Sequence, residues 1–416
     1  MRCEVVAIGT ELLLGQIVDT NSSWIGEQLA LSGIDSLLQT KVGDNVGRIV
    51  AAIDAALSRA DAVICCGGLG PTHDDLTRQA LAEAAGVELV FDEDRADVIR
   101  WMFRGRDRNM PDNNLAQAYR PATAEFLETQ PGTAPGLRCP LVVDGVEKVI
   151  YAVPGVPWEM KEMMQAEILP ELRRRSGFDG VIASRTLKTW GESESGLAER
   201  LDARIRELDA SGTSTIAFLA SGIEGLKVRI TAKADSVGEV EAVLAEEEAL
   251  VRAILGDDLI FGVDDETMES VVLDLLRSRG LTLGVAESLT GGLIGARLCS
   301  VPGASDVFRG GVISYASEVK FELLGVAEGP VVTEEAAAQM AVGVRRVVGS
   351  DVGIAATGVA GPDEQEGRPV GTVCLAIAIG DEVTTLEVRL PGQRNQVREF
   401  TVITLLSAVR RALLAG

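Results

Sequence analysis

The chain has 416 residues, of which 46% are hydrophobic, and this length predicts two or three domains rather than one. Its formal net charge of -23, from 39 basic and 62 acidic residues, argues against direct binding to nucleic acid. The sequence has no apolar run of the ~20 residues that a membrane span needs and no signal-peptide pattern at its start. We therefore expect a cytoplasmic protein that does not enter a membrane.

The six cysteines form no CxxC pair and lie in apolar surroundings, which favours buried free thiols. The chain contains one histidine, His73, so a histidine-built zinc site is excluded. Lysine is also scarce, because most basic residues are arginine and Lys320 is the only lysine after Lys233. These scarcities limit the side chains that can act as a general base.

The first segment alternates strand and helix signals. Strands or extended segments are predicted at residues 4–9, 34–42, 61–66 and from 147, and helices at 20–33, 46–60, 76–86 and from 157 towards Arg175. This order predicts a parallel sheet with helices on both faces, in which ligands bind beyond the carboxyl ends of the strands. Residues 104–136 are irregular, which favours a binding loop.

The pattern changes twice further along the chain. Two apolar strands at 215–220 and 226–232 and a helix at 237–255 are typical of a small α+β domain. Strands and helices then alternate again, with strands at 281–286, 351–358, 371–380 and 383–390 and a final helix at about 395–414. We therefore predict an α/β protein with two three-layer α/β domains, residues 1–172 and 259–416, joined by a small α+β domain, residues 173–258.

The loop "GGLGPTHDD", residues 67–75, follows the strand at 61–66 and is the first candidate site. Backbone N–H groups at Gly67, Gly68 and Gly70 can hold phosphate oxygens. The adjacent carboxylates of Asp74 and Asp75 suit a hard cation such as Mg²⁺ or the start of a helix. An ordinary turn with helix-start carboxylates is the alternative, and this pattern alone does not separate the two.

Five motifs follow one another in the first segment: "AIGTELLLGQIVDTN", "VGDN", "GGLGPTHDDLT", "GTAPG" and "PGVPWEM". Together they resemble the N-terminal domain of the CinA family, which is similar to the molybdopterin-binding fold of molybdenum-cofactor biosynthesis proteins. The resemblance implies a metal-dependent pyrophosphatase that splits ADP-ribose into AMP and ribose 5-phosphate.

Carried over by motif, the resemblance assigns metal or phosphate binding to Asp44, Asp74 and Asp75. It also implies a wider set of pocket residues: Glu11, Asn21, Asn114, Gln117, Thr133 and Glu159. A divalent ion, Mg²⁺ or a similar ion such as Co²⁺, would neutralise the pyrophosphate and activate water. Because imidazole is a poor ligand for Mg²⁺, His73 is predicted to be a bystander.

Ser288, in "VAESLTGG", lies between a predicted strand and a predicted helix, a geometry that exposes a serine hydroxyl near a helix N-terminus. The alternative is that Ser288 or Thr290 only caps that helix. A nucleophilic serine needs a base, and this domain has no histidine. Arginine stays protonated, which leaves carboxylates and Lys320, with Tyr315 nearby in sequence. A Ser–Lys or Ser–Tyr–Lys arrangement is favoured, and a solvated helix lysine is the alternative.

The motifs "AESLTGG", "YASEVK", "TGVAGP" and "PVGTV" resemble the C-terminal domain of the CinA family, which also occurs as a stand-alone nicotinamide mononucleotide deamidase. The resemblance implies that Ser288 attacks the carboxamide and that Tyr315 and Lys320 transfer the proton, without a cofactor. Leu289 stands where the family motif has cysteine, so no role of that cysteine carries over.

Substrate contacts in this domain are expected from several groups. The expected residues are Thr290 and Gly291 beside the serine, Thr357 and Gly358 as donors to the oxyanion or phosphate, and Arg394 and Arg398 as phosphate ligands. The leading hypothesis is thus a bifunctional hydrolase of pyridine-nucleotide recycling, with nicotinamide mononucleotide and ADP-ribose as substrates. The alternative is a non-catalytic pterin- or nucleotide-binding regulatory protein linked to competence or DNA damage. A homodimer is expected from the resemblance alone.

Overall fold

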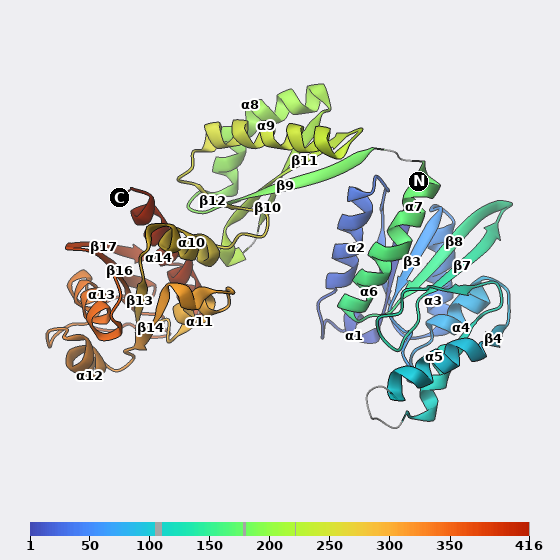
Figure 1. The fold of residues 1–416 in the computed structure, drawn as a ribbon, viewed down its shortest axis with the longest axis horizontal. Helices are drawn as coiled ribbons and strands as arrows, with labels where there is room; N and C mark the ends of the chain where they lie inside the picture. Colours follow the sequence, from blue (N-terminus) through green and yellow to red (C-terminus); the bar gives the residue numbers. More distant parts are fainter. Residues whose placement is uncertain (105–109, 178–179, 221, 416) are drawn as a thin grey trace. The chain divides into compact units, whose positions relative to one another are not determined.

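The computed structural model describes residues 1–104, 110–177, 180–220 and 222–415. The chain divides into two compact units, Met1–Ala183 with Lys233–Glu241 and Ser184–Ala232 with Ala242–Gly416 (Figure 1). Residues 105–109 of the predicted binding loop lie outside the described residues.

A six-stranded sheet in the order β2-β1-β3-β8-β7-β6 forms the centre of the first unit. Its strands are β1 (Cys3–Ile8), β2 (Gln39–Val42), β3 (Ala62–Cys66), β6 (Glu125–Phe126), β7 (Leu137–Val143) and β8 (Val146–Val153). The four strands β2, β1, β3 and β8 are parallel, which confirms the prediction for this part of the sheet. β7 pairs antiparallel with β8 and β6 at the edge of this sheet. The short strands β4 (Leu89–Phe91) and β5 (Tyr119–Pro121) form a separate antiparallel pair.

Helices cover both faces of this sheet, as predicted. They are α1 (Thr10–Leu13), α2 (Thr20–Leu31), α3 (Val46–Leu57), α4 (Thr77–Ala84), α5 (Glu93–Arg104), the 3₁₀ helix η1 (Asp112–Ala118), α6 (Pro157–Met163), the π-helix η2 (Met164–Ile168) and α7 (Leu169–Ser176). Val5 of β1 packs with α2 and α6, whereas Val6 packs with α3 and α4, because successive side chains of a strand point to opposite faces. The unit therefore has three layers.

The second unit contains a five-stranded sheet in the order β14-β13-β15-β16-β17. Its strands are β13 (Leu283–Glu287), β14 (Phe308–Ile313), β15 (Val352–Gly358), β16 (Thr372–Ile379) and β17 (Glu382–Arg389). β14, β13 and β15 are parallel, and β16 and β17 are antiparallel. Because parallel strands end on the same edge, the segments that follow β13, β14 and β15 meet there.

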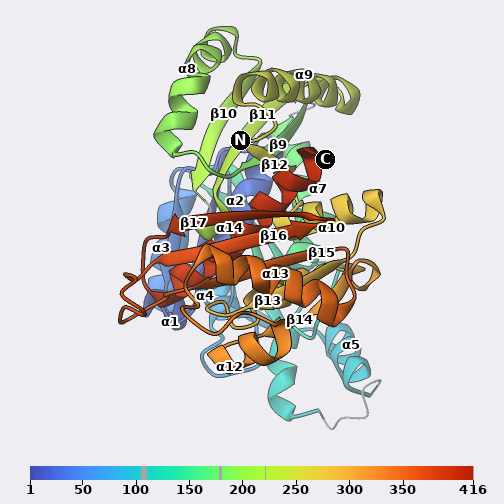
Figure 2. The same ribbon diagram turned by 90° about the vertical axis from the view of Figure 1, so that its left-hand side faces the viewer.

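The helices of this sheet also form two layers (Figure 2). They are α10 (Met268–Arg279), α11 (Leu293–Cys299), the 3₁₀ helix η4 (Ala304–Asp306), α12 (Ser317–Val319), the π-helix η5 (Lys320–Leu324), α13 (Glu334–Val348) and α14 (Arg394–Ala415). One core joins Val285 of β13 to α10, α11 and α14, and the other joins Ala286 to α13 and η5. The predicted three-layer α/β architecture is confirmed here too.

A smaller sheet in the order β10-β11-β9-β12 lies between the two α/β sheets in the sequence. Its elements are β9 (Val181–Thr189), α8 (Glu194–Ser211), β10 (Ser214–Ala220), the 3₁₀ helix η3 (Gly222–Glu224), β11 (Leu226–Ala234), α9 (Val237–Leu255) and β12 (Ile260–Val263). The two predicted strands are β10 and β11, and β9 and β12 were missed. β9 has a polar, weakly alternating sequence, and β12 has only four residues, so neither carries a strong strand pattern.

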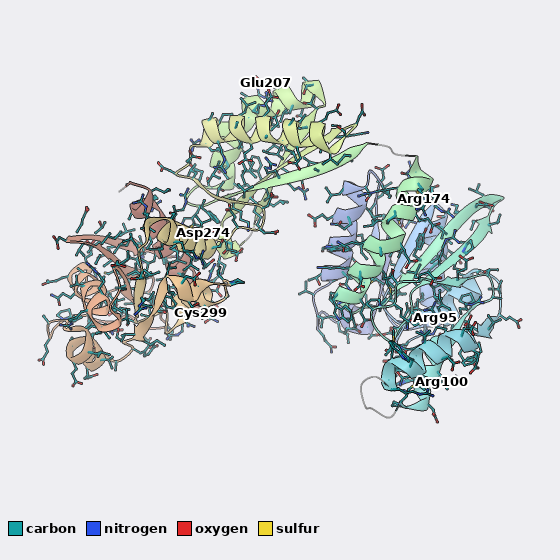
Figure 3. All side chains as sticks on the ribbon, in the orientation of Figure 1. Arg95, Arg100, Arg174, Glu207, Asp274 and Cys299 are labelled. Atoms are coloured by element: carbon teal, nitrogen blue, oxygen red, sulfur yellow. The ribbon has the colours of Figure 1, made fainter. Side chains whose placement is uncertain are left out.

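Two sequence predictions concern the surface of the chain. All six cysteines carry free thiols and five are buried, but Cys299 at the end of α11 is exposed (Figure 3), so the prediction of buried thiols was wrong there. Among the residues that the structure describes, no helix is long and apolar enough to cross a membrane.

Gly67, directly after β3, tests the packing that positions the first candidate site. Its φ is +108°, and a Cβ atom there would collide with the carbonyl oxygen of Ile8 in β1. We expect Gly67→Ala to lower the free energy of unfolding of the first unit by about 3 kcal/mol or more. Gly145→Ala is the matched control, because its φ is +78° but its Cβ would meet open space. That variant should lose about 1–2 kcal/mol; equal losses in chemical denaturation would contradict the account.

Candidate functional site

A cavity of about 310 Å³ lies at the carboxyl edge of the five-stranded sheet. Ser288 follows β13, Tyr315 and Lys320 follow β14, and Thr357 and Gly358 end β15, so the parallel strands bring these residues to one place. Arg394, the first residue of α14, completes the set of predicted residues that line the cavity. Six residues chosen from the sequence therefore share one site.

Ser288 lies in a tight turn whose backbone is fixed at both ends. Its N–H donates to the carbonyl of Ala356 at 2.9 Å, and its own carbonyl accepts from Gly291 N–H at 3.1 Å. The N–H groups of Gly292, Ile294 and Gly295 at the start of α11 donate to the buried Glu287 carboxylate at 2.8–3.0 Å. Glu287 therefore caps this helix. The alternative considered from the sequence had assigned this capping role to Ser288 or Thr290.

Lys320 is the first residue of the π-helix η5 and is 1% exposed, so it is not a solvated helix lysine. Its Nζ donates to the carbonyl oxygen of Ser314 at 2.6 Å. Burial lowers the pKa of the Lys320 ammonium below its ordinary value, while the negative charges of Glu366 and Glu318 oppose that shift. A buried amine with a lowered pKa can accept a proton nearer to neutral pH.

Tyr315 and Arg394 form a polar pair at the cavity. One Nη of Arg394 donates to the Tyr315 hydroxyl at 2.5 Å, and the other donates to the carbonyl of Gly361 at 2.6 Å. Both side chains are exposed, Tyr315 at 60%, so a ligand in the cavity can reach them from solvent. A guanidinium in this position suits a phosphate group.

Three predicted contacts lie outside this cavity. Thr290 is fully buried and its hydroxyl oxygen has no hydrogen-bond partner in the described structure. Arg398 donates to the carbonyl of Thr290 at 2.7 Å and a Cβ on Gly291 would face the Arg398 guanidinium, so these three residues contact one another. Arg398 thus contacts the backbone of the turn that begins at Ser288. Direct contact of Thr290, Gly291 and Arg398 with a substrate stays a prediction.

The glycine loop of the first unit is fixed by hydrogen bonds to its backbone. Gly67 N–H donates to Val153 O of β8 at 2.9 Å, so the prediction that this N–H is available to a phosphate oxygen was wrong. The Thr77 hydroxyl donates to Gly67 O at 2.7 Å. The buried guanidinium of Arg78 donates to Leu69 O and Gly70 O at 2.7 and 2.6 Å. Burial lowers the pKa of Arg78 to about 10, and Asp75 opposes the shift. Arg78 is therefore a structural cation under the loop.

A cavity of about 170 Å³ lies beside this loop and is lined by Glu11, Asn21, Cys66 and Gly67 among others. Asn21 donates to Gly155 O at 2.8 Å. Burial raises the pKa of the Cys66 thiol to about 12, so this thiol is not a nucleophile at neutral pH. Three of the predicted pocket residues, Glu11, Asn21 and Gly67, thus meet at one cavity.

The remaining pocket candidates of the first unit are tied to its backbone. Gln117 is buried and its amide lies 3.5 Å from Leu69 O, which links η1 to the glycine loop. Asn114 is buried and donates to Pro111 O at 3.1 Å, and Thr133 O accepts from Gln130 at 3.1 Å. A Cβ on Gly132 would collide with the Glu159 carboxylate, so Glu159 packs on the "GTAPG" loop. These contacts describe a supporting framework around the loop.

The three aspartates assigned to a metal have different surroundings. Asp44 Oδ2 accepts from Thr10 N–H at 2.8 Å, and Asp75 Oδ2 accepts from Thr72 N–H at 2.8 Å, while Asp74 and His73 are exposed. Within the described residues, no group of three or more His, Cys, Asp or Glu could hold a metal ion. Carboxylate oxygens fit a hard cation in kind, but a cation here would need phosphate and water oxygens to complete its shell.

Arg78, Glu287 and Ser314 are the main site-forming residues that the sequence analysis missed. Arg78 and Glu287 are charged residues inside or beside apolar elements, and a buried charge needs partners. That signal is present in the sequence, but their partners are backbone groups, which no residue pattern identifies.

Three known domain families match successive parts of the chain. Residues 4–174 match the family described as probable molybdopterin binding domain, residues 184–262 match the damage-inducible protein CinA KH domain, and residues 265–413 match the CinA C-terminal domain. The chain therefore combines these three domain types in one polypeptide.

Full-length relatives agree with this organisation. A CinA-like protein of Frankia casuarinae is 47% identical over 426 residues, which cover 100% of this chain and 97% of the relative. A putative competence-damage inducible protein of Moorella thermoacetica is 42% identical over 421 residues, with 100% and 99% covered. The chain belongs to the CinA family, and the resemblance found in its motifs is confirmed.

Among solved structures, the protein CinA of Thermoplasma acidophilum is 34% identical, with 40% of this chain and 94% of that chain covered and a TM-score of 0.36. A CinA superfamily protein of Klebsiella pneumoniae is 30% identical, with 36% and 97% covered and a TM-score of 0.35.

Proposed function

We propose that the second unit hydrolyses the carboxamide of nicotinamide mononucleotide to nicotinate mononucleotide and ammonia. The observation that carries the proposal is the cavity that Ser288 and a buried Lys320 line together. A volume of about 310 Å³ suits a small molecule rather than a macromolecule. The family resemblance supplies the particular substrate.

In the proposed reaction, the neutral amine of Lys320 accepts the Ser288 hydroxyl proton while Ser288 Oγ attacks the carboxamide carbon. The tetrahedral intermediate collapses when Lys320 returns the proton to the leaving nitrogen, and ammonia departs from an acyl ester on Ser288. Water then attacks the ester carbon and gives one proton to Lys320, which passes it to the departing Ser288 oxygen and so restores the serine hydroxyl. The acid product loses its remaining proton to solvent and leaves as the carboxylate. The Ser314 carbonyl orients Nζ by accepting one of its hydrogens.

Tyr315 and Arg394 have supporting roles in this proposal. The Arg394 guanidinium would bind the substrate phosphate, and the hydrogen bond that it donates fixes the Tyr315 hydroxyl. Tyr315 can then donate its own proton into the cavity and relay or orient the transferred proton. Backbone groups at Gly358 line the same cavity and are candidates for binding the oxyanion.

We also propose that the first unit cleaves ADP-ribose to AMP and ribose 5-phosphate. The supporting observation is the cavity beside the glycine loop, which Glu11, Asn21 and Gly67 line. A divalent ion would be held by Asp44, Asp74 or Asp75 together with phosphate oxygens, and when bound it would neutralise charge and activate water.

The competing proposal for the first unit is a non-catalytic pterin- or nucleotide-binding module. Association into a homodimer is a further prediction, which the mass of the protein in solution tests.

The roles of Ser288 and Lys320 predict how variants and pH change ammonia release. Ser288→Ala should lower kcat/KM at least about 10³-fold. Lys320→Arg should lower it about 10²- to 10⁴-fold, because a guanidinium cannot accept the proton. In the wild type, kcat/KM should rise with pH and level off above the lowered pKa of Lys320, since only the neutral amine is a base. Ser300→Ala and Lys161→Arg change exposed residues and serve as controls. Full activity of Lys320→Arg would contradict the role of Lys320 as the general base.

The first unit is tested with ADP-ribose in the presence and absence of divalent metal. We expect cleavage to stop in a chelator and to return with Mg²⁺ or Co²⁺, and Asp74→Asn to lose at least about tenfold in rate. His73→Gln should keep most of the activity, because His73 is exposed and imidazole is a poor Mg²⁺ ligand. Tight ADP-ribose binding without cleavage at any metal concentration would favour the non-catalytic module.

A further inference from the structure

A tight turn beside the second unit's cavity places an acidic residue in an unusual backbone conformation. Gln365 and Arg368 pair across the turn through two backbone hydrogen bonds, of 2.8 and 3.2 Å. The two residues between them, Glu366 and Gly367, have φ of +54° and +70°, which is the signature of a type I′ turn. Glycine adopts this conformation readily, whereas glutamate does not.

The Glu366 carboxylate binds two consecutive backbone N–H groups. Val331 N–H donates to its two oxygens at 2.9 and 3.2 Å, and Val332 N–H donates to Oε2 at 3.0 Å. Val331 and Val332 are buried and line the cavity that contains Ser288. Charge-assisted hydrogen bonds therefore attach the turn to the Val331–Val332 segment, which forms part of the cavity wall.

The same wall is held from its other side. The buried Thr357 hydroxyl, at the end of β15, donates to Val331 O at 2.9 Å. The Val331 residue thus has its N–H bound by Glu366 and its carbonyl bound by Thr357. Loss of either contact would free a segment that faces the substrate.

Glu366 also acts on Lys320 through its charge. The carboxylates of Glu366 and Glu318 both favour the protonated form of Lys320, in opposition to burial. Besides Lys320, the charged or titratable groups that line the cavity itself are Tyr315, Asp363, Glu364 and Arg394. Of all these groups, Glu366 alone contacts the backbone of the described cavity wall at Val331–Val332.

We propose that Glu366 is a positioning residue of the deamidase site, which holds the Val331–Val332 wall and stabilises the ammonium of Lys320 that forms when Ser288 loses its proton. This inference rests on the proposed deamidation. Burial lowers the pKa of Lys320 and the charge of Glu366 opposes that shift, so the two together set how readily Nζ accepts the serine proton. Glu366 touches neither the substrate nor the reacting atoms, so it acts through the wall and through Lys320.

Two conservative variants separate the two effects. Glu366→Gln keeps an oxygen acceptor for the wall but removes the charge, so the acidic limb of the kcat/KM profile should move down by about one pH unit. Its plateau kcat should fall about three- to tenfold because the base is weaker. Glu366→Asp keeps the charge but shortens the side chain, so the limb should stay in place while KM rises about three- to tenfold. Glu328→Gln, exposed on the segment that leads to Val331, is the charge-matched control and should match the wild type.

Nuclear magnetic resonance provides a readout that does not depend on turnover. The chain has only seven lysines, so the Lys320 Cε signal of a lysine-labelled protein can be assigned with Lys320→Arg. Its titration midpoint should fall in Glu366→Gln and stay in Glu366→Asp. If the wild type is active and Glu366→Gln shows the same pH profile and the same Lys320 titration as the wild type, the proposed role of Glu366 is wrong while the deamidation still stands. A wild type that releases no ammonia overturns the deamidation itself, and this inference with it.

Discussion

The burial of Lys320 against the carbonyl of Ser314 is the constraint on which the second site depends. An ammonium is costly to bury, so the surrounding structure has to compensate for it or accept a neutral amine. A 2.6 Å hydrogen bond from Nζ to Ser314 O and the negative charges of Glu366 and Glu318 compensate part of this cost. Burial still lowers the pKa of Lys320 below its ordinary value. In a domain without histidine, this partly compensated lysine is the group best suited to remove a proton from Ser288.

The sheet topology explains why this constraint can be met at one place. β13, β14 and β15 are parallel neighbours, so their carboxyl ends deliver Ser288, Tyr315 and Thr357 to the same edge. Glu287 then fixes the start of α11 through three backbone N–H groups, which frees Ser288 from a capping role. The first unit uses the same edge of a similar sheet, but its glycine loop is supported by a buried cation, Arg78, and its described residues form no group of three or more His, Cys, Asp or Glu that could hold a metal ion.

Local sequence patterns predicted the two α/β sheets, and together with the family resemblance they predicted six of the residues that line the second cavity. Buried strands and amphipathic helices carry a strong periodic signal, and the motifs around Ser288 and Lys320 lie at strand ends. The weakly alternating β9 and the short β12 lacked such a signal. The hydrogen bond that Arg398 donates to Thr290 O was not predicted, because the direction of a helix side chain depends on packing; its contact with the substrate stays a prediction. Glu366 was missed because its partners are backbone N–H groups 34 and 35 positions away.

The central claim, that Ser288 is a nucleophile served by Lys320, is tested most directly by trapping the acyl ester. The protein is mixed with nicotinamide mononucleotide, quenched in acid within one turnover, digested and analysed by mass spectrometry. The account predicts that the peptide with Ser288 gains the mass of the substrate less ammonia, and that Ser288→Ala shows no adduct and no ammonia. Undiminished ammonia release by Ser288→Ala, or an adduct on another residue, would contradict it.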